Sequence, residues 1–184
     1  MRGKSHIHLG LYLADRYMKD IPKPCIRAFL FGCIEPDRNP ITYLKGSLRC
    51  QWLRGHNYHN ARRFMRKISR RLEKKRGCLN LFDFYTLGKL IHYTTDAFTS
   101  AHNSTFSTNL VDHREYEVAL QEHFIQYLQD DPDICPKTAK NVMDIIYQHH
   151  AEYEALSANI YTDSKFALAA CCCVVALLFA KPVF

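Results

Sequence analysis

Residues 87–105 read LGKLIHYTTDAFTSAHNST. Apolar residues recur through this stretch at three- and four-residue spacing, which is the period of an α-helix. The same stretch carries three side chains that can bind a metal ion: His92, Asp96 and His102. A buried imidazole or carboxylate costs free energy unless it has a partner. A helix with such groups on an apolar background therefore indicates a partner, and a metal ion is the first candidate.

Helical periodicity extends over most of the chain, whereas strand patterns are nearly absent. We expect long helices at 6–19, 58–75, 81–102, 111–129, 137–160 and 164–180, and shorter ones at 25–34 and 45–54. Turn-forming residues separate them at 20–24, 35–40, 54–57 and 130–133. Pro136 suits a first helical turn, so we place the start of the helix expected at 137–160 near it. The sequence therefore predicts one all-α domain over residues 1–184, with seven or eight helices.

The cysteines and the amino terminus indicate the compartment. None of the eight cysteines forms a CxxC pair, which argues against a zinc ribbon or a dithiol redox motif. Cys171, Cys172 and Cys173 lie in an apolar run, where thiols act as small hydrophobic groups, and this usage favours a reducing compartment. The opening residues MRGKSHIHLGLYLAD make a poor secretory signal because two histidines and an aspartate interrupt the apolar run. We expect a cytoplasmic protein.

The most apolar run, FALAACCCVVALLFA at 166–180, has two interpretations. It holds 15 residues, fewer than the roughly 20 that a membrane-spanning helix needs. We therefore expect a core helix, and a membrane anchor is the alternative.

The positive charge is concentrated in one segment. The chain has a net charge of +7, and residues 62–76 hold nine of its 25 basic groups but one of its 18 acidic groups. This helix either presents a solvated face or binds an anionic surface such as a membrane leaflet. Nucleic acid is a less favoured partner for the same face. The residues assigned to anionic-surface binding are Arg62, Arg63, Arg66, Lys67, Arg70, Arg71, Lys74 and Lys75.

Two pairs of candidate ligands have helical spacing. His92 and Asp96 are four residues apart, so they share one helix face and can bind a single ion. His113 and Glu117 form a second such pair. On a continuous helix, His102 would lie roughly 15 Å beyond His92, too far to share that ion. Because imidazole and carboxylate groups suit zinc, the sequence predicts a multinuclear zinc site.

At this point the chain resembles the zinc-dependent phospholipase C family. The stretch HYTTDAFTSAH at 92–102 has the family's His-x3-Asp-x5-His spacing, and HREYE at 113–117 is similar to the His-x3-Glu that follows. Upstream, CIEPD at 33–37 and GHNY at 55–58 resemble segments that supply further ligands. SHIHLGLYLADRYM at 5–18 resembles the family's first helix, which opens with a histidine ligand. The resemblance extends from residue 5 to about residue 117.

The resemblance implies a site for two or three zinc ions. One ion would be held by Asp37, His56, His92 and Asp96, and a second by His102, His113 and Glu117. Asp96 would bridge to a third ion, completed by His6 and the amine of Met1, where secreted members of the family have a tryptophan. The resemblance favours His6 over His8 and His56 over His59. The pair His150 and Glu154 lies beyond the matched region, and we interpret it as a solvated helix face.

The resemblance also implies an activity. Zinc of this kind activates water for attack on a phosphodiester, and Asp37 would orient or deprotonate that water. The expected substrate is a phospholipid head group, with the protein peripheral to a membrane. The enzymatic alternatives are a single-strand-specific zinc nuclease and a hydrolase of another small phosphodiester. The related nucleases have an aspartate as the last ligand, so Glu117 favours the phospholipase. The alternative of another class is a non-catalytic helical module in which zinc only stabilises the fold.

Overall fold

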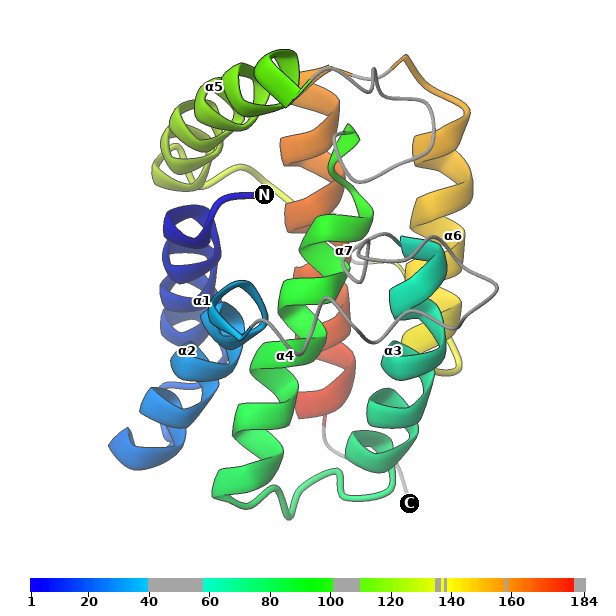
Figure 1. Ribbon diagram of the computed structural model, residues 1–184. Coiled ribbons are helices and arrows are strands. Elements are labelled where there is room, and N and C mark those ends of the chain that lie inside the picture. The colour runs from blue at the N-terminus through cyan, green and yellow to red at the C-terminus, as the bar shows by residue number, and fades with distance from the viewer. Residues whose placement is uncertain (40–57, 101–109, 135–136, 138, 158, 181–184) are drawn as a thin grey trace.

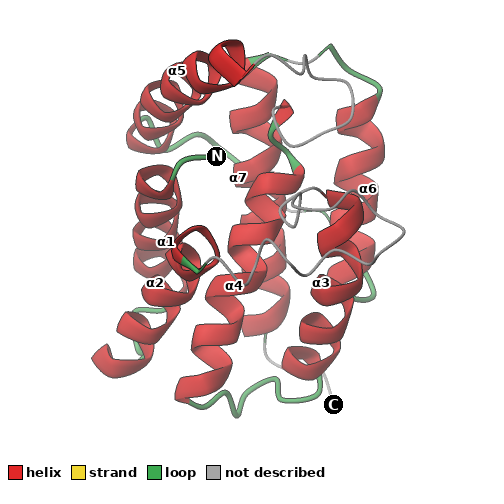
Figure 2. Cartoon of the chain, in the orientation of Figure 1, coloured by secondary structure: helices red, strands yellow, loops and turns green. Residues whose placement is uncertain are grey.

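The computed structural model describes residues 1–39, 58–100, 110–134, 137, 139–157 and 159–180, with the backbone alone for 59–60 and 110–113. Within these ranges the chain forms seven helices and no strand (Figure 2). The helices are α1 (Gly3–Tyr17), α2 (Lys23–Arg38), α3 (Tyr58–Glu73), α4 (Leu81–Ala97), α5 (Leu110–Gln129), α6 (Val142–Glu154) and α7 (Ile160–Phe179). The prediction of an all-α fold is confirmed. The helix expected at 45–54 lies outside the described residues.

Helix α4 is the centre of the arrangement (Figure 1). It packs against α1, α2, α3 and α7, and α7 in turn contacts α1, α5 and α6. All but three of its seventeen residues are buried, from Asp83 to Ala97 with Tyr85 half-buried. Residues 87–97, the first part of the stretch LGKLIHYTTDAFTSAHNST, therefore lie on a helix that is buried almost throughout.

Two glycines bring α2 and α4 into backbone contact. A Cβ atom on Gly88 would lie 2.1 Å from the carbonyl oxygen of Phe29, and one on Gly32 would lie 2.1 Å from that of Tyr85. Neither position can carry a side chain without moving a helix. This close approach brings the end of α2, with Asp37, against the carboxyl-terminal half of α4.

Helix α4 begins as its sequence indicates but ends earlier than predicted. Asn80 caps it, because its side chain accepts from the Asp83 N–H at 3.0 Å while Asp83 accepts from the Asn80 N–H. The helix ends at Ala97, so the expected span of 81–102 was wrong at its end. The spacing of roughly 15 Å, which assumed a continuous helix as far as His102, therefore does not apply.

The early end of α4 follows from a buried carboxylate on α7. Asp163 is fully buried and accepts from both the backbone N–H and the hydroxyl of Ser100, at 2.7 and 2.8 Å. It also accepts from the hydroxyls of Tyr116 and Tyr153, at 2.8 and 2.7 Å. Four donors therefore satisfy this carboxylate, and they tie the end of α4 to α5, α6 and α7.

Other helix ends also differ from the prediction, and side-chain caps decide two of them. Asn141 and Asn159 accept from N–H groups three residues on, so α6 begins at Val142 and α7 at Ile160 rather than at 137 and 164. Helix α2 continues through Pro36 to Arg38, where a turn was expected. A proline in a last turn removes only one helical hydrogen bond, and the Asn39 N–H still bonds to the carbonyl oxygen of Glu35. Asp37 therefore lies on a helix.

Helix α7 is long and apolar enough to cross a membrane by length and composition, and 67% of that apolar window is buried inside the protein. It is longer than the 15-residue run, so the length argument against a spanning helix was wrong. The burial of Cys171, Cys172 and Cys173 supports the expected core helix.

The pair His150 and Glu154 differs from expectation. His150 is buried with its ring stacked on that of Tyr58 at 3.7 Å, so only Glu154 lies on a solvated face.

We expect Gly88→Ala to destabilise the protein, although alanine is the better helix former by about 1 kcal/mol. The added methyl group overlaps the backbone of α2, so we expect a loss of about 3 kcal/mol and a Tm lower by about 5–10 °C. Thermal unfolding followed by circular dichroism measures the change.

Gly10→Ala is the matched control for this experiment. Its Cβ atom would lie 2.9 Å from the flexible end of Leu30, which can move aside. A Tm for Gly88→Ala equal to or above that of Gly10→Ala would contradict the proposed backbone contact.

Candidate metal centre

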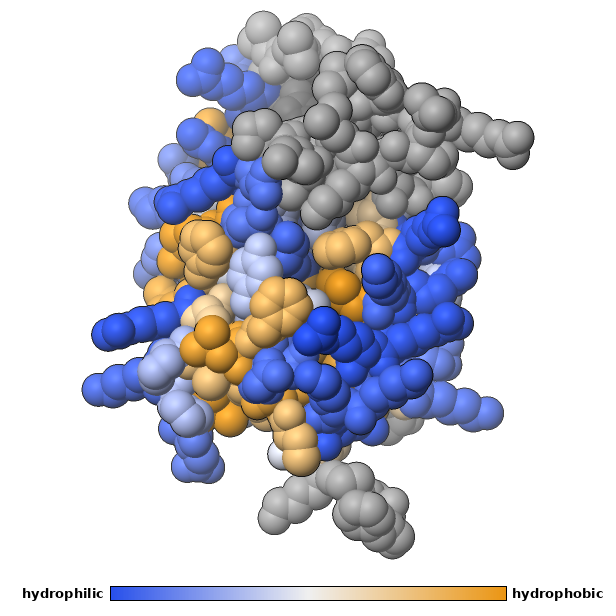
Figure 3. Space-filling model, turned by 60° about the horizontal axis from the view of Figure 1, so that its bottom comes forward, coloured by the Kyte–Doolittle hydropathy of each residue, from blue (hydrophilic) through white to orange (hydrophobic). Residues whose placement is uncertain are grey.

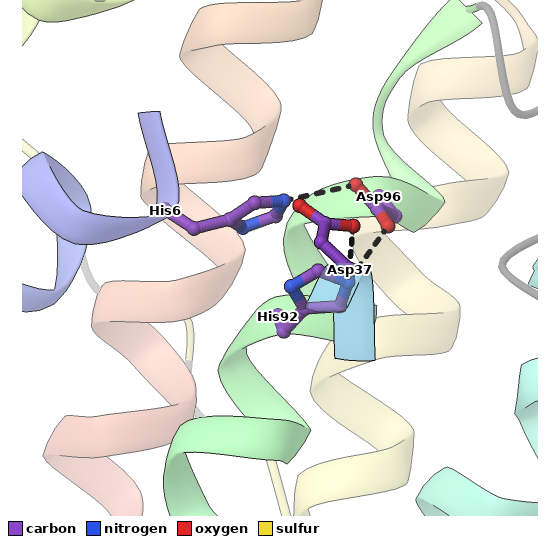
Figure 4. Close-up of side chains that lie close together, drawn as sticks. All are labelled: His6, Asp37, His92 and Asp96. Carbon is purple, nitrogen blue, oxygen red and sulfur yellow. Dashed lines mark ion pairs between the residues drawn. The ribbon is translucent and has the colours of Figure 1, made fainter. Parts of the chain in front are cut away.

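Four side chains from three helices converge above the contact of α2 and α4 (Figure 4). His6 comes from α1, Asp37 from α2, and His92 and Asp96 from α4. One potential ligand atom from each lies within 4.8 Å of the others. His6, His92 and Asp96 are at most 1% exposed, whereas the Asp37 side chain is 27% exposed. The cluster is therefore enclosed on three sides and reaches solvent through Asp37.

The helix geometry explains the convergence. His92 and Asp96 are one turn apart on α4, and Nε2 of His92 lies 3.2 Å from Oδ2 of Asp96. Asp37 stands in the last turn of α2, with Oδ1 at 3.5 Å from the same Nε2 atom. Nε2 of His6 lies 3.3 Å from Oδ1 of Asp96. Asp96 is thus shared by both imidazoles, one on each of its oxygens.

His6 is the clearest sign that something is bound here. Both ring nitrogens are buried and have no hydrogen-bond partner among the described residues. Burial and the adjacent His92 ring, stacked at 4.0 Å, lower the pKa of His6 to about 4. The imidazole is therefore neutral near pH 7 and has a free lone pair. A buried polar group in this state fits a metal ion, which would accept that lone pair.

His92 is oriented by the backbone of α2. Its Nδ1 atom lies 2.9 Å from the carbonyl oxygen of Cys33, an acceptor that requires a proton on Nδ1. Nε2 therefore points toward Asp37 and Asp96. Burial disfavours protonation of this ring, but the carboxylates of Asp96 and Asp37 outweigh it and raise the pKa of His92. An N–H that holds a histidine against a carbonyl oxygen is the usual support of a metal ligand.

The amine of Met1 and the carboxylate of Glu117 extend the cluster. The amine is buried, donates to Oδ1 of Asp96 at 2.9 Å and lies 3.4 Å from Oε1 of Glu117. Burial alone would lower the pKa of this amine, but Asp96 and Glu117 raise it above its usual value. Glu117 thus meets the cluster from α5, beside the Asp96 oxygen that also faces His6.

The structure brings together six of the residues singled out from the sequence and is silent on others. It places Met1, His6, Asp37, His92, Asp96 and Glu117 in one cluster. His56 and His102 lie outside the described residues, as do the side chains of His59 and His113, although the backbone of His113 belongs to α5. His8 is half-buried on α1 and is not part of the cluster.

Sequence reasoning missed a buried ion pair beside the cluster. Nζ of Lys89 lies 2.6 Å from Oε2 of Glu35, and both side chains are about one-tenth exposed, 10% and 11%. Lys89 precedes His92 by one turn and Glu35 precedes Asp37 by two residues, so the pair supports both helices next to the ligands. A lysine within the apolar run LGKLIHY was the available signal, because a buried lysine requires an acidic partner.

An all-α domain with buried imidazoles and carboxylates around a shared aspartate defines a candidate helical metalloprotein. The family model of zinc dependent phospholipase C matches residues 5–172. The chain therefore belongs to the zinc-dependent phospholipase C family, as its motifs indicated. Comparison with curated proteins and with solved structures gives no significant match. The His and Asp cluster is compatible with the metal that this family uses.

We expect the purified protein to contain two or three zinc ions, and His6→Ala to lose about one of them. The reason is that His6 contributes a neutral, buried imidazole to the cluster. Elemental analysis of protein prepared without chelator measures the content. His8→Ala is the matched control, since this histidine lies two residues away outside the cluster. Equal zinc loss in both variants would contradict the assignment.

Proposed function

We propose that this protein is a zinc-dependent phosphoric diester hydrolase that cleaves the head group from a phospholipid. The observation that carries the proposal is the cluster of His6, Asp37, His92 and Asp96, in which two buried imidazoles face one shared carboxylate. Membership of the zinc-dependent phospholipase C family supports the same reaction class.

The residues of the cluster divide into buried and open positions. His6, His92 and Asp96 are enclosed and would hold zinc, which supplies a Lewis acid and an activated water when it is bound. Asp37 is the most exposed of the four, so its carboxylate is the one that meets solvent and substrate. It is suited to orient the attacking water and to accept its proton, which is a general base role. With zinc bound, both imidazoles would act as neutral donors of lone pairs, because a metal ion displaces the proton of a ligating histidine.

Glu117 supports a phospholipid as the substrate. A glutamate at this position is the phospholipase form of the motif, whereas the related nucleases have an aspartate. Its carboxylate is 19% exposed and extends from α5 to the Met1 amine at 3.4 Å. The longer glutamate side chain therefore spans the distance from α5 to the cluster.

The described thiols support a cytoplasmic location, with the protein peripheral to a membrane. Cys25, Cys33 and Cys78 are free, as are the three adjacent cysteines of α7. Burial raises the pKa of the Cys33 and Cys171 thiols, so these groups are kept as neutral, unreactive packing atoms. We propose the inner leaflet as the source of substrate.

The test is turnover of a soluble chromogenic phosphodiester, of short-chain phosphatidylcholine and of single-stranded DNA by one preparation. We expect release of diacylglycerol to exceed cleavage of DNA, and chelator to abolish both. Asp37→Asn should lower turnover by at least about 100-fold because the general base is lost. Asp15→Asn, which changes an exposed aspartate of α1, is the matched control.

Three results would overturn parts of the proposal. A DNA rate clearly above the lipid rate would favour the nuclease. Full activity of Asp37→Asn would remove the assigned base. Zinc-loaded protein that is inactive toward every phosphodiester would favour the module in which zinc only stabilises the fold.

A further inference from the structure

Half of the large exposed hydrophobic side chains of the described residues come from the middle of α2 and the start of α4, two helices that pack together. The six are Leu11, Phe31, Leu81, Phe82, Leu156 and Tyr161. Phe31 on α2 and Leu81 and Phe82 at the start of α4 are each more than half exposed, at 53, 54 and 53%. Such a local excess of exposed apolar area indicates an interaction site.

These side chains are organised around Tyr85. The ring of Phe31 stacks on that of Tyr85 at 5.9 Å, and the ring of Phe82 lies 5.8 Å from it on the other side. We call Phe31, Tyr85 and Phe82 the aromatic row. The row bridges the two helices whose backbones meet at Gly32 and Gly88, so its position is set by the closest packing in the molecule.

Helix α3 presents its positive charge beside this row. Its buried face includes Met65, Ile68 and Leu72. Of the predicted anionic-surface residues, Arg62 and Arg66 donate to the Tyr147 hydroxyl, and Arg71 and Lys75 bind the buried carboxylate of Asp83. The other four, Arg63, Lys67, Arg70 and Lys74, are exposed and form no ion pair with a described residue.

These four have the spacing of a single helix stripe, at intervals of four, three and four residues. We call them the basic stripe. Arg62 and Arg66, which bind Tyr147, flank the basic stripe on one side. Arg71 and Lys75, which bind Asp83, flank it on the other. Glu73 does not neutralise the stripe, because its carboxylate accepts from the Val142 N–H at the start of α6 at 2.6 Å. The stripe therefore carries a positive charge that the described part of the protein leaves unbalanced.

The aromatic row and the basic helix are in direct contact. The guanidinium of Arg71 lies over the ring of Phe82 at 4.8 Å while it binds Asp83 at 3.0 Å. Arg27, also exposed, stands one turn before Phe31 on α2. Figure 3 shows this end of the molecule, where hydrophobic groups gather beside hydrophilic side chains. The surface thus combines an apolar patch with a basic border.

The aromatic row and the metal centre share one side of α4. Phe82, Tyr85, Lys89, His92 and Asp96 follow one another at intervals of three and four residues, which places them along one stripe of the helix. Lys89 connects the two ends: its Nζ atom lies 3.3 Å from the Tyr85 hydroxyl and 2.6 Å from Glu35. Phe82 and His92 are roughly 15 Å apart along the axis.

We propose that the aromatic row, Leu81 and the basic stripe form a docking surface for a bilayer that contains anionic phospholipid. Lysine and arginine near such a surface are attracted by its negative potential, and exposed aromatic and leucine side chains enter the boundary between head groups and acyl chains. A single-stranded polynucleotide would use the basic stripe and stack bases on the aromatic row, but it offers no apolar layer for Leu81 to enter, and this combination favours the bilayer. The inference rests on the proposed function, because the docked lipid is also the proposed substrate.

The experiment is co-sedimentation with vesicles of phosphatidylcholine, with and without phosphatidylserine, at low salt. Phe31→Gln/Leu81→Gln and Lys67→Gln/Arg70→Gln/Lys74→Gln each remove one part of the surface. We expect wild-type protein to prefer the anionic vesicles and each variant to bind them at least about tenfold more weakly. Turnover of the soluble phosphodiester should stay at the wild-type level, since none of these residues belongs to the metal centre.

Matched controls separate the surface from general changes in hydrophobicity and charge. Leu11→Gln/Leu156→Gln changes two half-exposed leucines elsewhere, and Lys19→Gln/Arg114→Gln/Lys165→Gln removes three exposed charges, one from the turn after α1 and the others from α5 and α7. We expect both controls to bind like wild type. If Phe31→Gln/Leu81→Gln fails to fold, the single variant Leu81→Gln takes its place and Leu156→Gln is its control. The two leucines are nearly equally exposed, at 54 and 53%.

The outcomes distinguish this inference from the proposed function. One outcome is that the wild-type protein binds anionic vesicles, the surface variants lose this binding, and the wild-type protein cleaves no phosphodiester. This outcome would support the docking surface and refute the proposed function. An active enzyme that ignores anionic vesicles would overturn the surface alone. Variants that bind vesicles no more weakly than their controls would also overturn it, as would tighter binding to single-stranded DNA than to vesicles.

Discussion

The carboxylate of Asp96 lies 1% exposed at the centre of the molecule, and a negative charge in that position is unstable without cationic or hydrogen-bonding partners. Its partners come from different parts of the chain: Nε2 of His6 on α1, Nε2 of His92 on α4 and the amine of Met1. Meeting this one requirement places α1 and the amino terminus against α4. The same arrangement gathers the ligands of the candidate metal centre.

Three fully or nearly fully buried aspartates hold the described helices together, and their partners differ in kind. Asp163 is satisfied by hydroxyl and N–H donors, and Asp83 by Arg71, Lys75 and its own helix cap. Those two need nothing further. Asp96 instead faces two imidazoles, one of which has no hydrogen bond among the described residues. This difference in partners distinguishes a candidate metal site from the structural carboxylates around it.

The sequence patterns correctly predicted the features that depend on residues close together in one helix. The apolar period located each described helix, and the four-residue spacing of His92 and Asp96 placed both side chains on one face of α4. Helix ends were less well predicted. The apolar pattern predicted a later end for α4 and an earlier start for α6 than the structure has. The hydrogen bonds of Ser100 to Asp163 decide the first of these ends, and capping by Asn141 decides the second. Such contacts do not alter the apolar pattern.

The sequence by itself determined the all-α class, the ligand types and the concentration of charge on α3, since each depends on residue identity and on spacing within one helix. Only the tertiary structure decided which groups meet. The contact of Gly32 with Gly88 brings Asp37 to His92, and the fold of α1 brings His6 to Asp96. The same packing joins Phe31 to Tyr85 and Arg71 to Phe82. Contacts between residues far apart in sequence depend on how helices pack, and no spacing within one helix records that.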